Sequence, residues 1–147
     1  MGGISFQVPG RILKNQITLK ATALADTGVN RSIFCNTMKA LEVIKHYGAK
    51  TRWLEEPIPV IDYASRPRQA ITYGIKLNLE LDGVMYPNTF MLITDCGKHD
   101  LLVGFQFFTQ HQLLLDPVNR KLIQWVQEIL PFFGWTLTIQ PLRPENH

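Results

Sequence analysis

The chain has 147 residues, of which 46% are hydrophobic and 18% charged. This composition is typical of one globular domain with its own core, and it excludes an intrinsically disordered protein. The formal net charge is +3, and the Lys and Arg residues are scattered along the sequence. Nucleic-acid binding requires a clustered basic face, so we expect no nucleic-acid partner.

Neither a membrane span nor a metal site is indicated. No apolar run approaches the roughly 20 residues of a transmembrane helix, and no charged-then-apolar leader opens the chain. We therefore expect no membrane partner and a soluble, intracellular protein or a segment of a polyprotein. The four histidines are isolated, so we expect no metal and no cofactor. Cys35 and Cys96 stand in apolar settings and are expected to be free thiols, not a disulfide.

Short strands dominate the amino-terminal part. Residues 4–8 alternate weakly and predict a strand that ends at a turn formed by Pro9 and Gly10. Residues 17–25 predict a long strand, and residues 33–35 predict a short one.

A helix is expected over residues 37–47. Asn36 is suited to cap its amino terminus, and Gly48 is suited to end it. The apolar positions expected to pack are Met38, Leu41, Val43 and Ile44.

Prolines at 57 and 59 predict a break in the chain before the next strands. Residues 71–81 then alternate cleanly, which predicts a half-buried strand. Asp82 and Gly83 are a hairpin turn signal, and residues 85–94 form the expected partner strand.

The last elements repeat an earlier order. Residues 100–104 predict a strand ending in glycine and residues 105–111 a short helix, followed by a hairpin over residues 113–125. The order strand, loop, strand, helix therefore occurs twice, through Asp26 to Leu41 and through Phe90 to His111.

Asp26, Thr27 and Gly28 form the most informative motif. One carboxylate ends an apolar strand, small turn-forming residues follow it, and a second apolar strand comes next. A carboxylate at such a position is costly unless it is hydrogen-bonded or functional. This triplet is therefore the leading candidate for a catalytic site.

The sequence resembles the retropepsin-like aspartic proteases, the single-lobe dimeric enzymes of retroviruses and long-terminal-repeat retrotransposons. Residues 23–34 are similar to the apolar-Asp-Thr-Gly-x-x-x-Ser pattern of that family. Residues 99–108 are similar to its apolar-apolar-Gly strand with a short helix, and residues 113–116 with 122–125 to its closing hairpin. Order and spacing agree over residues 15–126.

The resemblance implies an all-β fold, an acid-protease-like closed β-barrel or sandwich lobe with one or two short helices. The domain would span residues 1–126. Residues 127–147 would be an apolar tail or strand, which either packs on its own subunit or joins the amino-terminal strand in a dimer sheet.

It also implies an aspartic endopeptidase that acts as a homodimer on protein or polyprotein substrates, in the cytoplasm or in a retroelement particle. A twofold axis would bring Asp26 of each subunit together, and two close carboxylates share one proton. The Thr27 hydroxyl could then link the two facing loops, and Gly28 permits a close approach. Ser32 or its neighbours would support the loop from behind.

The flap of the family corresponds to residues 60–72, without the glycine-rich tip of viral members. Its expected substrate-binding residues are Ile61, Asp62, Tyr63, Ala64 and Ser65.

Alternatives come from different classes of function. The fold could serve as a catalytically idle dimerisation or peptide-binding module, because folds host many functions. Asp95, Cys96 and Gly97 could imitate a second catalytic motif, but cysteine is a poor substitute for the threonine hydroxyl, and a turn at a strand end is the better interpretation. Cys35 could be a nucleophile, although an inert apolar cysteine is the simpler expectation.

Overall fold

The computed structural model describes residues 3–61, 67–130 and 134–141, with side chains over residues 3–60 and 70–125. Its elements in chain order are β1 (Ser5–Lys14), β2 (Ile17–Asp26), β3 (Ile33–Asn36), α1 (Thr37–Tyr47), β4 (Thr51–Ile61), β5 (Pro67–Leu81), β6 (Val84–Thr94), β7 (Leu101–Val103), α2 (Phe105–Gln110), β8 (Leu113–Asp116), β9 (Lys121–Leu130) and β10 (Gly134–Pro141).

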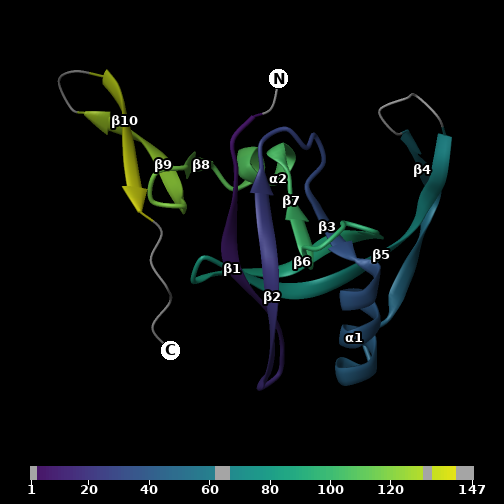
Figure 1. Cartoon of the computed structure of the whole chain (residues 1–147). Helices are drawn as coiled ribbons and strands as arrows, with labels where there is room; N and C mark the ends of the chain where they lie inside the picture. The colour runs from purple at the N-terminus through teal and green to yellow at the C-terminus, as the bar shows by residue number, and fades with distance from the viewer. Residues whose placement is uncertain (1–2, 62–66, 131–133, 142–147) are drawn as a thin grey trace.

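Most of the strands belong to one closed sheet (Figure 1). Seven strands pair in the order β1-β2-β7-β3-β6-β5-β4, and a further pairing of β1 with β5 closes six of them into a barrel. β4 lies outside the barrel as an edge strand on β5. β8, β9 and β10 form a separate three-stranded sheet on the side away from β4. The expected all-β class with short helices is confirmed.

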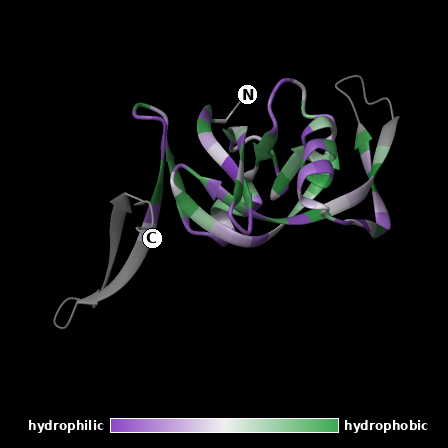
Figure 2. Cartoon of the chain, turned by 90° about the horizontal axis from the view of Figure 1, so that it is seen from below, coloured by the Kyte–Doolittle hydropathy of each residue, from purple (hydrophilic) through white to green (hydrophobic). Residues whose placement is uncertain are grey.

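Alternating hydrophobicity explains why these segments form a barrel. Exposed and buried residues alternate along β1 from Ser5 to Ile12, and hydrophobic and hydrophilic bands follow one another along the strands in Figure 2. The short strand β3 is instead buried at all four of its residues. The largest side chains that are fully buried include Ile12 of β1, Leu79 of β5, Met91 of β6 and Phe107 of α2. The core thus joins elements from both halves of the sequence.

β1 differs from the expectation, because it runs through Pro9 and Gly10 without a turn. Pro9 precedes the point at which β1 begins to pair with β5, and proline is tolerated where a strand is paired on only one side. At Gly10, a Cβ would lie 2.9 Å from the carbonyl oxygen of Ala21. Glycine therefore allows close approach of β2 and does not break the strand.

β4 also continues through both prolines, so the predicted break before residue 60 is wrong. As the edge strand, β4 has one side without backbone partners in the described sheet, where prolines are tolerated. Their effect is local: the pairing with β5 shifts register between Trp53 and Ile58 and again before Val60.

α1 has the predicted bounds and caps. The Asn36 side chain accepts a hydrogen bond from the backbone N–H of Met38 at 3.1 Å. Gly48 takes the left-handed conformation with φ 64°, and its N–H donates to the carbonyl of Ile44. Local capping chemistry is sufficient to define both ends.

The packed face of α1 agrees with the prediction at Val43, which is buried, and at Ile44, which packs against the core, but not at Met38 and Leu41. Met38 and Leu41 are 72% and 55% exposed, whereas the buried residues are Lys39, Ala40, Val43 and Tyr47. Small Ala40 lets the helix approach the barrel, and the Tyr47 hydroxyl donates to the carbonyl oxygen of Ile12 at 2.8 Å. These contacts depend on the barrel and cannot be seen in the helix sequence alone.

The β5–β6 hairpin is confirmed, with positive φ at both Asp82 and Gly83. The Asp82 carboxylate accepts from the backbone N–H of Leu122 at 3.1 Å and lies 3.3 Å from Nζ of Lys121. This turn therefore fastens the three-stranded sheet to the barrel.

Candidate active site

The two halves of the barrel interlock around the loop that contains Asp26. β2 pairs in parallel with β7, β3 pairs in parallel with β6, and β3 and β7 are antiparallel neighbours between them. The repeated order seen in the sequence therefore corresponds to a structural repeat, β2-β3-α1 and β6-β7-α2. Backbone hydrogen bonds also run between the halves in both directions, including one from Asn36 to Asp100 at 2.8 Å and one from Gly104 to Ser32 at 2.7 Å.

The loop between β2 and β3 is fixed from behind by the start of α2. The N–H of Phe105 donates to the carbonyl of Val29 at 2.7 Å, and that of Gln106 to the carbonyl of Arg31 at 3.3 Å. A Cβ on Gly104 would overlap the carbonyl oxygen of Arg31. The glycine after β7 is thus required by the close contact between the two loops. The expected support from Ser32 and its neighbours is confirmed, and it comes from backbone carbonyls.

Asp26 lies at the end of β2 and is partly buried. Its Oδ1 accepts the backbone N–H of Gly28 at 2.8 Å, which holds the carboxylate against its own turn. A Cβ on Gly28 would lie 3.1 Å from this oxygen. A side chain at position 28 would therefore press on the carboxylate, so glycine suits this turn.

Thr27 contacts the amino-terminal segment of its own chain. Its hydroxyl oxygen accepts the N–H of Ile4 at 2.8 Å, and its own N–H donates to the Ile4 carbonyl at 2.9 Å. A Cβ on Gly3 would overlap the Thr27 hydroxyl. The structure therefore brings Asp26, Thr27 and Gly28 into one ordered turn beside the start of β1.

A second turn of the same local form follows β6. Oδ1 of Asp95 accepts the N–H of Gly97 at 3.0 Å, as Oδ1 of Asp26 does from Gly28. Burial raises the pKa of the Cys96 thiol to about 12, so the thiol stays protonated at neutral pH. Asp95, Cys96 and Gly97 therefore form a turn at a strand end, as the sequence indicates.

Cys35 is buried in β3, and both cysteines are free thiols. Desolvation raises the pKa of Cys35 to about 12. A thiolate nucleophile is consequently disfavoured at this position.

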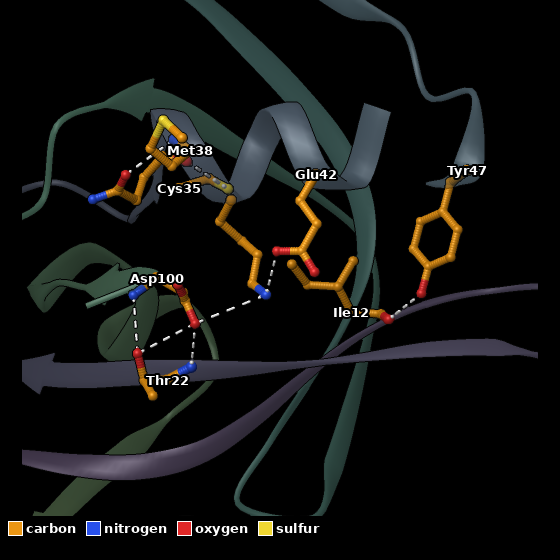
Figure 3. Close-up of polar contacts among 9 residues, drawn as sticks. Ile12, Thr22, Cys35, Met38, Glu42, Tyr47 and Asp100 are labelled. Carbon is orange, nitrogen blue, oxygen red and sulfur yellow. Dashed lines mark hydrogen bonds and ion pairs between the residues drawn. The ribbon is translucent and has the colours of Figure 1, made fainter. Parts of the chain in front are cut away.

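A polar cluster missed by the sequence analysis fixes β2 a few residues before Asp26 (Figure 3). Oδ2 of Asp100 accepts the N–H of Thr22 at 2.9 Å, and the Asp100 N–H donates to the Thr22 hydroxyl at 3.0 Å. Nζ of Lys39 lies 4.0 Å from the same carboxylate and 3.0 Å from Glu42. In the sequence, this cluster is indicated by Thr22, a polar residue among the apolar residues of 21–25 in β2. The partners of Thr22 come from parts of the chain that are distant in sequence.

The predicted flap corresponds to the hairpin of β4 and β5. Ile61 ends β4 and pairs with Pro67. The other predicted flap residues, Asp62, Tyr63, Ala64 and Ser65, lie outside the described residues. In Figure 1 the outer ends of β4 and β5 point in the same direction as the loop after β2.

A cavity of about 660 Å³ opens at the base of this hairpin. Among the described residues, its lining consists of Thr37, Val60, Ala70, Ile71, Thr72, Tyr73, Ile93, Thr94, Asp95 and Gly97. We call it the flap-base cavity. Four elements and a turn contribute to it, which is why no single sequence motif indicated it.

The described residues show neither a metal site nor a membrane-spanning helix. Within residues 3–61, 67–130 and 134–141, no group of three or more His, Cys, Asp or Glu side chains is placed to hold a metal ion. Over the same ranges, no helix has the length and apolar character needed to cross a membrane.

Comparison with known proteins addresses the fold. The sequence matches no protein-family profile and no curated protein. The structure is similar to the crystal structure of the retroviral protease-like domain of Ddi1 from Leishmania major, with a TM-score of 0.53 and 18% sequence identity. The match covers 90% of this chain and 92% of that domain. The fold is that of a retropepsin-like lobe. The loops that interlock around Asp26 therefore belong to the fold that the sequence resemblance implies.

Proposed function

We propose that the protein is an aspartic endopeptidase that acts as a homodimer. The observation that carries this proposal is the position of Asp26, whose carboxylate is held by Gly28 N–H at the loop where the two halves of a retropepsin-like lobe interlock. The chain has one Asp-Thr-Gly sequence, so two copies are needed to supply two such carboxylates.

The chemistry follows from two like charges at short distance. Two facing Asp26 carboxylates cannot both ionise easily, so the pair holds one proton, as is established for aspartic proteases. The ionised member accepts a proton from water while the protonated member donates to the carbonyl oxygen of the peptide bond. The carboxyl that took the proton from water then donates it to the amide nitrogen, and the other carboxylate accepts a hydroxyl proton of the tetrahedral intermediate. The C–N bond breaks, the amine and the new carboxyl end are released, and the pair again holds one proton.

Thr27 and the flap hairpin would have supporting roles. In a dimer, Thr27 would face the partner's loop. The contact between Thr27 and Ile4 orders the Asp26 loop within its own subunit. The substrate would bind as an extended strand beneath the hairpin of β4 and β5, held by backbone hydrogen bonds. Protein or polyprotein segments with apolar residues at the cut are the proposed substrates.

The decisive experiment compares the native protein with Asp26→Asn on unfolded protein substrates from acidic to neutral pH. Asparagine keeps the oxygen that accepts from Gly28 but cannot act as a base, so cleavage should fall by about a thousandfold or more. Asp116→Asn is the matched control, because Oδ1 of Asp116 also accepts the N–H of the residue two positions later, Val118 at 3.1 Å, and it should retain cleavage. Equal cleavage by the native protein and Asp26→Asn would refute the proposal and favour an idle peptide-binding module.

Mixing the two forms tests the shared site. If one dyad needs Asp26 from both subunits, random pairing of equal amounts leaves about a quarter of dimers active. Activity per total protein should then fall to about a quarter of the native value, whereas independent active monomers would give about half. The latter result would contradict the dimeric site.

A further inference from the structure

The flap-base cavity has a chemical character that the proposed cleavage reaction does not explain. Asp95 provides the one charged side chain among the described residues that line it. Thr37, Thr72 and Thr94 line the same space, and no described lysine, arginine or histidine does so. The described lining therefore carries one negative charge and no basic side chain that would neutralise it.

The cavity lining also includes an aromatic ring. Tyr73 of β5 lines the cavity, and Trp53 of β4 packs on Tyr73 with ring centroids 4.1 Å apart. Trp53 is 68% exposed, so its indole is accessible beside Tyr73. A site that combines a carboxylate with an aromatic surface is a favourable environment for a cation with an aliphatic stem.

The Asp95 carboxylate is held in place by its own turn. Its Oδ1 accepts the N–H of Gly97 at 3.0 Å, and Gly97, with φ 72°, is also part of the lining. The adjoining Asn36 side chain donates from Nδ2 to the Gly97 carbonyl at 3.1 Å. The acidic side of the cavity is thus fixed to the end of β3 and does not need to be ordered by a ligand.

We propose that the flap-base cavity is a specificity site that binds a lysine or arginine side chain of the peptide substrate. Asp95 supplies the counter-charge, and Tyr73 and Trp53 supply the aromatic surface along the aliphatic stem. This inference rests on the proposed function, because it concerns the substrate of the same site. It adds that the enzyme selects peptides with a basic residue at the position that occupies this cavity.

The cavity extends along the strands of the hairpin. Val60 of β4 pairs with Arg68, one residue from the outer end of β5, whereas Ala70 to Tyr73 lie three to six residues from that end. With a rise of about 3.3 Å per residue, the stretch from Ala70 to Tyr73 is about 10 Å long. A substrate strand beneath the hairpin would therefore pass the cavity, and the peptide position that enters it is identified by moving a lysine along the peptide.

The test uses the full chain with Asp26→Asn, which binds peptide without cleaving it. Its probes are fluorescent ten-residue peptides of one apolar sequence, each with a single lysine at a different position, and matched peptides with norleucine. We expect one or two positions at which lysine strengthens binding about five- to tenfold, because an exposed ion pair and a cation–π contact are each modest. The preference should decrease with added salt.

Two further substitutions in this background assign the preference to the cavity. Asp95→Asn keeps an oxygen for Gly97 and removes the charge, so lysine and norleucine peptides should bind equally. Trp53→Leu should lower the preference by about threefold or more. Glu55→Gln is the matched control, since Glu55 is an exposed acid on β4 that does not line the cavity, and it should leave the preference unchanged.

The outcomes separate this inference from the proposed function. If no peptide position prefers lysine, or if Asp95→Asn leaves the preference intact, the specificity site is refuted even when the native protein cleaves. If the preference follows Asp95 but the native protein cleaves none of the peptides, the proteolytic function fails and the cation site stands as a peptide-binding site.

Discussion

Replacement of Gly104 by alanine tests whether the two interlocked loops form the structural basis of the site. A Cβ at this position would overlap the carbonyl oxygen of Arg31 and would also lie 2.8 Å from that of Val29. Both atoms belong to backbone that cannot rotate away, so the loop carrying Asp26 must move as a unit. The hydrogen bonds from Gly104, Phe105 and Gln106 to this loop would then be stretched or lost.

The size of the effect follows from these contacts. Three backbone hydrogen bonds at about 1 kcal/mol each give a loss of about 3 kcal/mol in the free energy of unfolding. A domain of this size has roughly 5–15 kcal/mol, so Gly104→Ala should fold and show a lower urea midpoint. Peptide cleavage should fall more than the folded fraction, because the displaced loop carries the proposed catalytic residue.

Gly48→Ala is the control for this experiment. Gly48 ends α1 with φ 64°, and a Cβ there would meet nothing within 4 Å. Its replacement should cost about 1–2 kcal/mol from backbone conformation alone and should leave cleavage by the folded protein unchanged. Equal unfolding free energies for the two variants, or full activity of Gly104→Ala, would refute the argument that this contact positions the loop.

Three further predictions concern buried groups. Tyr47→Phe removes hydroxyl bonds to the carbonyls of Ile12 and Ile17 and should lower the unfolding free energy by about 1–2 kcal/mol in urea titration; an unchanged midpoint would contradict this. Desolvation lowers the pKa of His111, so the unfolded chain binds a proton at this side chain more readily than the folded protein does. The contribution of His111 to stability is therefore complete above about pH 6.5 and decreases as the pH falls below that value. His111→Gln should reduce this decrease in urea titrations at several pH values. A pH dependence identical to the native one would exclude His111 as its source. Because burial raises the pKa of Cys35 to about 12, iodoacetamide at pH 8 should label it roughly a thousandfold more slowly in the native than in the unfolded protein; similar rates by mass spectrometry would contradict its burial.

The elements that the sequence predicted correctly have local causes. Asn36 and Gly48 specify the ends of α1 through their own side-chain and backbone chemistry, and Asp82 with Gly83 specifies the β5–β6 turn in the same way. The turn at Asp26 is also local, because its carboxylate and the N–H it accepts are two residues apart. Such features need no knowledge of the rest of the chain.

The errors arise where a distant partner decides the outcome. Pro9 was expected to break a strand, but the partial pairing of β1 allows it. Met38 was expected to pack, but the barrel instead receives the smaller Ala40, with Lys39 directed to Asp100. The flap-base cavity forms where three strands, the start of a helix and a turn meet, and hydrophobic periodicity along the sequence does not show that these elements come together.

The two related turns show why the same local geometry leads to different proposed roles. Asp26 and Asp95 each accept an N–H from the glycine two residues later, at nearly equal distances. Their middle residues differ: the Thr27 hydroxyl is bonded to the start of β1, whereas the Cys96 thiol lies 3.6 Å from the carbonyl oxygen of Thr94. Their surroundings differ as well, since α2 holds the loop of Asp26 in the interlocked centre while Asp95 lines the cavity together with Tyr73. In the roles proposed above, one carboxylate of the repeated half-lobe serves a symmetric pair and the other a substrate side chain, and the Asp26→Asn and Asp95→Asn variants should separate turnover from selection.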